Sequence, residues 1–312
     1  MSRIVVTGGS GRLGRNLVAG LAAFGHEVVS LDRAPSDDLR IDGVEQISID
    51  LLDAAATAET LVRAKADSVV HLAAIAVPFS APEDVIMRTN TGLAVSVLGG
   101  AVDAGIGRIV AASSPTVLGY GNPSGWLPES LPLDETSTPR PWNAYALSKL
   151  MIEQTVSMLH RRTGDDVRYA TFRPCYVIAP EEWAGAPTQQ GHTVAERIAD
   201  PALSAPALFN YVDARDVASF TDLLLGALPD IPNAEVFFVG ADDALADAPL
   251  AELLPRFVPG TDDLARTLTG TSPAFSNAKA ARVLGWRPRH SWRTELTSSS
   301  LNAVSDRKDV PV

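Results

Sequence analysis

The chain is poor in cysteine and in basic residues. Cys175 is the only cysteine among 312 residues, so no disulfide can form within the chain and no CxxC metal motif is possible. Lys and Arg number 26 against 37 Asp and Glu, which gives a formal net charge of −11. Nucleic acid and anionic membranes are therefore not expected partners, because both are bound by clustered basic side chains. The five His form no HxxxH or HExxH pattern, so we expect no metal site.

Long hydrophobic runs are missing as well. The N-terminus passes from Ser2 and Arg3 directly into the short run 4–6, and no run of about 18 apolar residues follows. With the single cysteine, this predicts a protein that stays in the cytoplasm. The composition, 46% apolar and 20% charged, predicts a globular chain with a large core.

Short β-branched runs alternate with longer helical patterns through the first half of the chain. We expect strands at Arg3 to Thr7, Glu27 to Leu31, Val44 to Ile49, Ser68 to Leu72, Arg108 to Ala112 and Arg168 to Phe172. We expect helices at Leu13 to Phe24, Ala54 to Lys65, Pro82 to Ala104 and Tyr145 to Arg162. This order is typical of βαβ units and predicts an α/β fold with a Rossmann-type doubly wound parallel sheet.

The alternation stops after Pro174, where prolines interrupt the pattern. We expect a small C-terminal substrate-binding lobe there, although a strand returns at Val236 to Val239 and a helix at Asn277 to Leu284. The predicted division assigns 1–173 and 214–240 to the dinucleotide-binding core, and 174–213 and 241–312 to the lobe. The tail from Ser298 is polar, and we expect it to be frayed.

A glycine-rich loop follows the first expected strand. Gly8, Gly11 and Gly14 have GxxGxxG spacing directly before a helix, a context that lets backbone N–H groups and the helix dipole hold a pyrophosphate. Asp32 ends the second strand, where a carboxylate can bind ribose hydroxyls and disfavours a 2′-phosphate. NAD is therefore the expected cofactor, and NADP stays open because Arg33 could offset that repulsion. The alternative is a plain tight turn with a surface charge.

Tyr145 and Lys149 lie four residues apart in an expected helix, so both project from one face. A nearby ammonium and the positive nicotinamide stabilise a phenolate, which predicts a lowered pKa and an acid/base role for Tyr145. Lys149 would also hold the nicotinamide ribose, and Ser114 would donate a hydrogen bond to the reacting oxygen. The alternative is an unrelated surface Tyr and Lys beside a strand-end Ser.

Further motifs accompany these residues: Asp50-Leu51, His71 to Ala74, Asn90-Thr91-Gly92, Ser113 to Gly119, Asp213 to Ala218 and Leu284 to Pro288. With them, nearly the whole chain resembles the extended short-chain dehydrogenase/reductase family, the NAD-dependent epimerase/dehydratase group. The glycine loop and this resemblance together mark the following residues as cofactor-binding: Gly8, Ser10, Gly11, Arg12, Leu13, Gly14, Asp32, Arg33, Asp50, Leu51, Leu72, Ala73, Ala74, Asn90, Tyr145, Lys149 and Pro174.

The chain departs from the family pattern at the substrate positions. Pro115 and Thr116 stand where dehydrating members carry an Asp-Glu pair, so elimination loses support. Epimerases commonly place an Asn that touches the nucleotide after an Arg-Tyr-Phe run, but this chain reads Arg173-Pro174-Cys175-Tyr176 and lacks the amide. Phe209 stands where they often carry an Arg that clamps diphosphate. Arg266 or Arg256 could supply that charge from the lobe. The candidate substrate-binding residues are Thr116, Tyr176, Gln189, His192 and Arg266.

These patterns predict an NAD-linked enzyme that transfers a hydride at a secondary alcohol or ketone of a sugar or nucleotide sugar. If the keto product leaves, the enzyme is a dehydrogenase; if it rotates and is reduced again, the enzyme is an epimerase. A non-nucleotide polyol or carbonyl substrate is the alternative, and a non-catalytic NAD(P) sensor is a further one. The resemblance also implies a homodimer built through the helices at 82–104 and 145–162.

Overall fold

The structure, a computed structural model, describes residues 1–296. Its contacts divide the chain into two compact units. The first, here the sheet unit, comprises Met1–Leu118, Pro139–Arg173 and Val217–Phe237. The second unit comprises Gly119–Thr138, Pro174–Asp216 and the residues from Phe238 on. Residues 119–138, expected in the dinucleotide-binding core, thus group with the second unit, and the tail expected from Ser298 lies outside the described residues.

A seven-stranded sheet forms the framework of the sheet unit, with the strand order β3-β2-β1-β4-β5-β6-β9. The strands are β1 (Arg3–Thr7), β2 (Glu27–Asp32), β3 (Val44–Ser48), β4 (Ser68–His71), β5 (Arg108–Ala112), β6 (Arg168–Pro174) and β9 (Glu235–Val239). The pairings from β3 through β6 are all parallel. The order reverses between β1 and β4, which makes this edge the topological switch point where doubly wound sheets bind ligands. The predicted fold class is confirmed.

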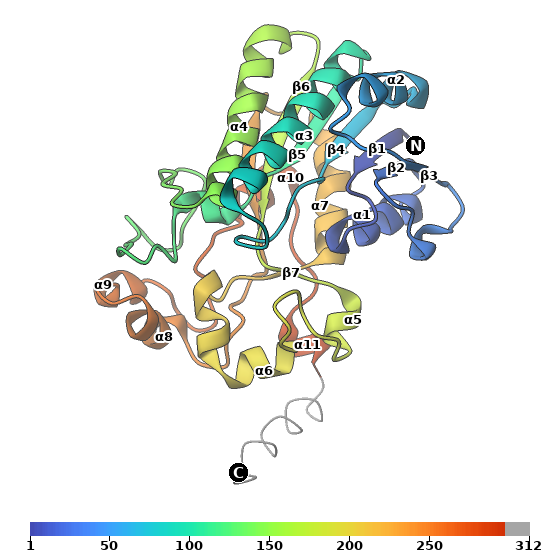
Figure 1. The fold of residues 1–312 in the computed structure, drawn as a ribbon. Helices are drawn as coiled ribbons and strands as arrows, with labels where there is room; N and C mark the ends of the chain where they lie inside the picture. Colours follow the sequence, from blue (N-terminus) through green and yellow to red (C-terminus); the bar gives the residue numbers. More distant parts are fainter. Residues whose placement is uncertain (297–312) are drawn as a thin grey trace. The chain divides into compact units, whose positions relative to one another are not determined.

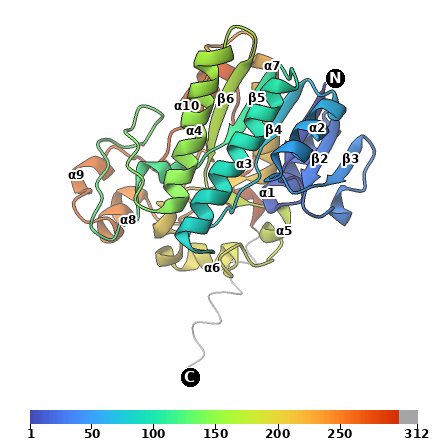
Figure 2. The same cartoon turned by 45° about the horizontal axis from the view of Figure 1, so that its top comes forward.

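Helices cover both faces of this sheet (Figure 1). The helices α2 (Ala54–Ala64), α3 (Glu83–Asp103) and α4 (Ala144–Thr163) share one apolar cluster with Val5 of β1. Ile4 and Val6 are equally buried but outside that cluster, as the period-two alternation of a strand requires. Figure 2 shows α2, α3 and α4 side by side across one face of the sheet.

On the other face, α1 (Arg12–Ala23) packs closely against α7 (Ala214–Ala227). A Cβ placed on Gly20 of α1 would lie 2.5 Å from the Cβ of Ala218. The two helices therefore approach through a glycine and an alanine, and a larger residue at either position would push them apart.

By length and composition, α3 could cross a membrane, and it is the one helix of the described chain that could. Its buried side chains, among them Leu93, Val97 and Ala101, belong to the same apolar cluster as β1, α2 and α4. Since this side packs against the sheet and its neighbouring helices, α3 serves as a core helix of the sheet unit.

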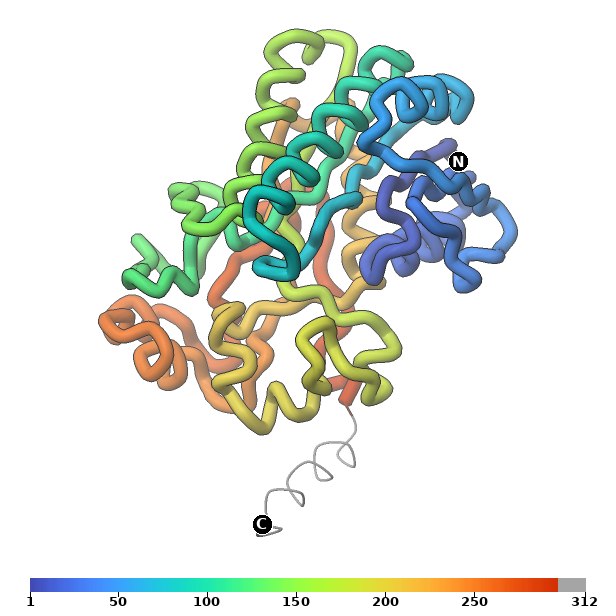
Figure 3. Tube along the Cα trace, viewed as in Figure 1, coloured from blue at the N-terminus to red at the C-terminus, as the bar shows by residue number. Residues whose placement is uncertain are grey.

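The second unit is built from short elements (Figure 3). They are β7 (Val177–Ile178), β8 (Val212–Asp213), α5 (Pro180–Trp183), α6 (Val194–Ala199), α8 (Leu250–Phe257), α9 (Asp262–Ala265), α10 (Ala278–Leu284) and α11 (Trp292–Glu295). An apolar cluster that includes Ile178, Trp183, Tyr211 and Trp292 forms its core. Among these elements the sequence analysis predicted α10 alone.

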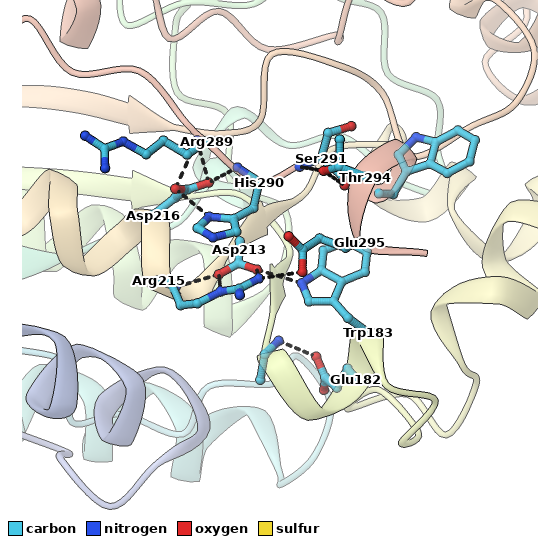
Figure 4. Close-up of polar contacts among 12 residues, drawn as sticks. Glu182, Trp183, Asp213, Arg215, Asp216, Arg289, His290, Ser291, Thr294 and Glu295 are labelled. Carbon is cyan, nitrogen blue, oxygen red and sulfur yellow. Dashed lines mark hydrogen bonds and ion pairs between the residues drawn. The ribbon is translucent and has the colours of Figure 1, made fainter. Parts of the chain in front are cut away.

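Two buried carboxylates hold the chain around α11 in place (Figure 4). Asp213 accepts a hydrogen bond from Trp183 Nε1 at 2.6 Å, and its partner Arg215 also binds Glu295 of α11 at 2.8 Å. Asp216 accepts bonds from the Arg289 N–H at 3.0 Å and from the His290 ring at 2.9 Å. Asp213 and Asp216 therefore organise the part of the second unit around α11.

Candidate active site

The glycine loop between β1 and α1 has no room for a side chain at Gly8 or Gly14. Gly8 has a φ of +72°, and a Cβ there would lie 2.8 Å from the Ala73 backbone after β4. A Cβ on Gly14 would lie 2.0 Å from the Gly8 carbonyl oxygen. Gly11 is the N-cap of α1 and makes no side-chain cap bond to the first turn of that helix. This open helix start beside a bare loop fits the pyrophosphate of a dinucleotide.

Asp32 lies at the end of β2, directly beside this loop. Its Oδ2 accepts a hydrogen bond from the Ser10 N–H at 3.0 Å, and its Oδ1 accepts one from the Arg33 N–H at 2.7 Å. A carboxylate has about four lone-pair sites, so it can accept ribose hydroxyls in addition. Its negative charge, held next to the pyrophosphate position, fits NAD better than NADP.

The other expected cofactor residues surround this loop. Arg12 and Leu13 begin α1 and are half-buried, as are Leu72, Ala73 and Ala74 after β4. Asp50 is exposed and accepts a bond from the Leu52 N–H, whereas Leu51 is buried in the apolar cluster below α2 and α3. Pro174 is the last residue of β6 and belongs to the second unit.

Asn90, an expected cofactor ligand, is engaged in hydrogen bonds within the protein. Its side chain is fully buried, with the oxygen bound to the Ile75 N–H at 2.8 Å. Its nitrogen donates to Ser148 Oγ at 3.0 Å and to the Ile75 oxygen at 3.2 Å. Asn90 therefore ties the loop after β4 to α4, and its expected contact with the cofactor stays a prediction.

The structure brings Ser114, Tyr145 and Lys149 together in the sheet unit. The helix α4 begins after Asn143, whose side chain caps the Ala146 N–H at 2.9 Å, and this places Tyr145 in the first turn. The Lys149 ammonium lies 5.9 Å from the centre of the Tyr145 ring and donates to the Ala112 oxygen at the end of β5 at 3.0 Å. All three side chains are buried.

Burial dominates the electrostatics of this cluster. It raises the pKa of the Tyr145 phenol to about 12, although the hydrogen bond from Ser114 lowers it. It also lowers the pKa of Lys149 to about 8. The expected lowering of the Tyr145 pKa is therefore not present in the protein alone. Burial of the phenol, which the sequence does not reveal, outweighs the effect of nearby positive charge.

A neutral histidine adjoins the cluster. Burial, together with the charge of Lys149, lowers the pKa of His71 to about 3. Its Nδ1 lies 2.8 Å from Thr7 Oγ1, while its buried Nε2 has no hydrogen-bond partner. His71 therefore stays uncharged at the pH of the cell.

The residues that hold α4 against the sheet were not predicted from the sequence. Glu153 lies one turn after Lys149 and binds the Arg173 guanidinium at the end of β6. Ser113 donates to the same carboxylate at 2.6 Å. The available signal was the spacing of Tyr145, Lys149 and Glu153, which places all three on one helix face.

The expected substrate residues fall into both units. Thr116 belongs to the sheet unit and donates to Ser114 Oγ at 2.9 Å. The other four lie in the second unit. Gln189 and His192 are exposed on a turn, and Arg266 is an exposed partner of Asp263 at 2.9 Å.

Tyr176 packs in the second unit against a cation that the sequence did not single out. The Arg197 guanidinium lies 4.4 Å from the centre of the Tyr176 ring, and Arg197 is almost fully buried. Phe209, at the position where epimerases often carry an arginine, is fully buried against Phe257. The described residues contain no cluster of three or more His, Cys, Asp or Glu that could hold a metal ion.

Residues 4–240 match the NAD dependent epimerase/dehydratase family. A UDP-glucose 4-epimerase of Azospirillum brasilense is 34% identical over 161 residues, which are 49% of this chain and 43% of that enzyme. A UDP-glucose 4-epimerase of Lactobacillus helveticus is 24% identical over 92% of both chains. A ketoreductase of Stigmatella aurantiaca, which acts on a farnesylated dihydroquinoline oxide, is 32% identical over 59% of this chain and 53% of its own length.

Solved structures share the fold. A UDP-glucose 4-epimerase from Stenotrophomonas with bound NAD is 22% identical and superposes with a TM-score of 0.72 over 99% of this chain and all of that one. A short-chain dehydrogenase/reductase from Agrobacterium tumefaciens with bound NAD is 24% identical, with a TM-score of 0.69 over 98% of each chain.

The family match extends over most of the chain and confirms three predictions: the resemblance, the enzyme class and NAD as the cofactor. The chain belongs to the NAD dependent epimerase/dehydratase family.

Proposed function

We propose that the protein oxidises or reduces a secondary alcohol or ketone of a sugar or nucleotide sugar, with Ser114, Tyr145 and Lys149 as its catalytic residues. The observation that carries this proposal is the buried cluster of these three side chains in the unit that holds the bare glycine loop. A helix-surface Tyr and Lys would be exposed to solvent instead.

The bound cofactor supplies the hydride acceptor and a positive ring. Tyr145 takes the proton of the substrate hydroxyl during oxidation and returns it during reduction. Lys149 adds positive charge beside the phenol, while Ser114 donates a hydrogen bond to the reacting oxygen. Because the phenol alone has a pKa of about 12, it is protonated at neutral pH and ready to donate in the reductive direction.

The residues that follow Ser114 favour redox chemistry over elimination. Pro115 and Thr116 follow Ser114 and carry no carboxylate, so the extra acid and base that elimination needs are missing there. Relatives named as UDP-glucose 4-epimerases support a nucleotide sugar. Phe209, apolar and fully buried, favours the second candidate, a polyol or carbonyl substrate without a diphosphate.

Asp32 supports NAD over NADP, since a 2′-phosphate would meet its charge. A binding titration with both dinucleotides tests this preference, and we expect tighter binding of NAD. Equal affinity for NAD and NADP would contradict the role proposed for Asp32.

We also propose a cytoplasmic homodimer assembled through α3 and α4. The outer faces of these helices expose Val95, Met151 and Met158, with 61%, 42% and 48% of their surface accessible. Such apolar side chains on neighbouring helices suit burial against a second copy. The double variant Met151→Glu/Met158→Glu is expected to be a monomer by light scattering, and an unchanged mass would contradict this interface.

The activity is tested by incubating the purified protein and NAD with UDP-glucose, UDP-galactose, galactose and glucuronate. A dehydrogenase accumulates NADH, whereas an epimerase interconverts the UDP-sugars without net NADH. Tyr145→Phe is expected to lose at least about a hundredfold in turnover while it still binds NAD. A sensor would show no turnover in either form, and full turnover by Tyr145→Phe would contradict the mechanism.

A further inference from the structure

Thr116 makes two hydrogen bonds to one atom. It lies in the 3-10 turn Pro115–Leu118 that follows β5. Its hydroxyl donates to Ser114 Oγ at 2.9 Å, and its backbone N–H donates to the same oxygen at 3.3 Å. Both bonds lie within the sheet unit.

A serine hydroxyl has one proton and two lone pairs. The hydroxyl and the backbone N–H of Thr116 occupy both lone pairs of Ser114 Oγ. Ser114 can then make a further hydrogen bond only by donating its own proton. Ser114 forms a hydrogen bond with the side chain of Tyr145. The three groups therefore form a series that runs from Thr116 through Ser114 to Tyr145, and hydrogen bonds in series polarise one another.

We propose that Thr116 is a positioning residue that directs the Ser114 proton toward the Tyr145 oxygen. Without the Thr116 hydroxyl, Ser114 Oγ regains a free lone pair and its proton can rotate away. When the Thr116 hydroxyl is present, Ser114 is a fixed donor that stabilises negative charge on the phenol or on the reacting substrate oxygen. This inference rests on the proposed function, in which Tyr145 exchanges a proton with substrate.

Other charged groups near Tyr145 stay in place when Thr116 changes. Lys149 on α4 lies 5.9 Å from the ring centre. Glu153 is neutralised by Arg173, and His71 on β4 is uncharged because its pKa is lowered to about 3. A change in the ionisation of Tyr145 on substitution of Thr116 is therefore assigned to the Ser114 bond.

The experiment compares Thr116→Val with Thr116→Ser in the NAD-loaded protein. Valine keeps the shape and the backbone N–H of Thr116 but removes the hydroxyl, whereas serine retains it. Phenolate formation is followed by ultraviolet difference spectroscopy, with Tyr145→Phe in each background as the blank. We expect Thr116→Val to raise the pKa of Tyr145 by about half to one pH unit, and Thr116→Ser to restore it.

The pH profile of kcat/KM gives the second readout, with whichever sugar of the panel is turned over. Thr116→Val is expected to lower kcat/KM about fivefold to tenfold and to shift its acidic limb upward, with KM unchanged. If both variants keep the wild-type Tyr145 pKa, or if Thr116→Ser behaves like Thr116→Val, the proposal is overturned. A rise in KM alone would make Thr116 a substrate contact instead. The spectroscopic arm needs no substrate, so it decides the role of Thr116 even if Tyr145→Phe retains turnover and the proposed function fails.

Discussion

Arg173 and Glu153 form a bidentate ion pair in the interior of the sheet unit. Arg173 Nε lies 2.8 Å from Glu153 Oε1 and Nη2 lies 2.9 Å from Oε2, with 3% and 7% of the two side chains exposed. Arg173 is the last but one residue of β6 and Glu153 lies on α4, so the pair fixes the helix that carries Tyr145 and Lys149 against the sheet.

Removal of one charge from this pair should destabilise the protein. Glu153→Gln removes the Glu153 counter-charge from the buried Arg173 guanidinium, and we expect a loss of about 3 kcal/mol in the free energy of unfolding. Urea denaturation measures this. Glu27→Gln is the matched control, because its pair with Arg3 is about half exposed on the Glu side and should contribute less than about 1 kcal/mol. Equal effects of the two variants would contradict the buried role.

Gly14→Ala should abolish tight NAD binding. The added Cβ would lie 2.0 Å from the Gly8 oxygen and 2.8 Å from the Gly9 Cα, so the loop has to move. Gly99→Ala is the control, because a Cβ there meets nothing within 4 Å on the same kind of helix backbone. It should bind NAD normally and gain roughly 0.5–1 kcal/mol in stability. Isothermal titration calorimetry measures both affinities, and unchanged binding by Gly14→Ala would exclude the loop as the pyrophosphate site.

His71 should make the protein sensitive to acid. Its pKa is lowered to about 3 in the folded state from an ordinary value of 6.5. Between these pH values the unfolded chain binds more protons than the folded one, so stability is present above about pH 6.5 and falls as the pH drops toward 3. The slope from this group reaches at most about 1.4 kcal/mol per pH unit.

The variant His71→Asn keeps a polar group near Thr7 and cannot titrate. Its free energy of unfolding should vary less between pH 6.5 and the acid limit of folding, as measured by urea titrations at several pH values. His192→Asn, at an exposed position, should keep the wild-type slope. A wild-type slope in His71→Asn would contradict the assignment.

Lys149 should affect stability on the alkaline side. Burial lowers its pKa to about 8 from 10.5, so between these values the unfolded chain binds the extra proton. This group therefore makes the protein more stable as the pH rises from about 8 to 10.5. Lys149→Met should remove this rise and lose turnover. Urea titrations between about pH 8 and 10.5 measure the free energy of unfolding, and Glu27→Gln, at an exposed ion pair, should keep the wild-type rise. A wild-type rise in Lys149→Met would show that another group is responsible.

Much of the sheet unit could be predicted from local sequence. The strands at Arg3–Thr7 and Arg108–Ala112 were predicted with the observed bounds, and the long helices within one or two residues of theirs. Buried parallel strands and amphipathic helices carry strong periodic patterns, which explains this agreement.

The second unit could not be predicted in the same way. Helices of four to eight residues, such as α5, α6 and α8, are too short to establish a period, and α8 contains Pro255. The longer helix α7 was also missed, because its first residues were interpreted as a motif and not as the start of a helix. These short elements depend on packing between distant residues such as Trp183 and Asp213.

The sequence alone determined the fold class, the glycine loop and the helical spacing that places Tyr145 and Lys149 on one face, because these depend on residues close together in the chain. The tertiary structure decided the state of those groups. Burial raises the pKa of Tyr145 and lowers that of Lys149, the Asn90 side chain bonds Ile75 and Ser148, and Arg173 meets Glu153 from another element. Solvent exclusion and long-range pairing arise only when segments far apart in sequence pack together.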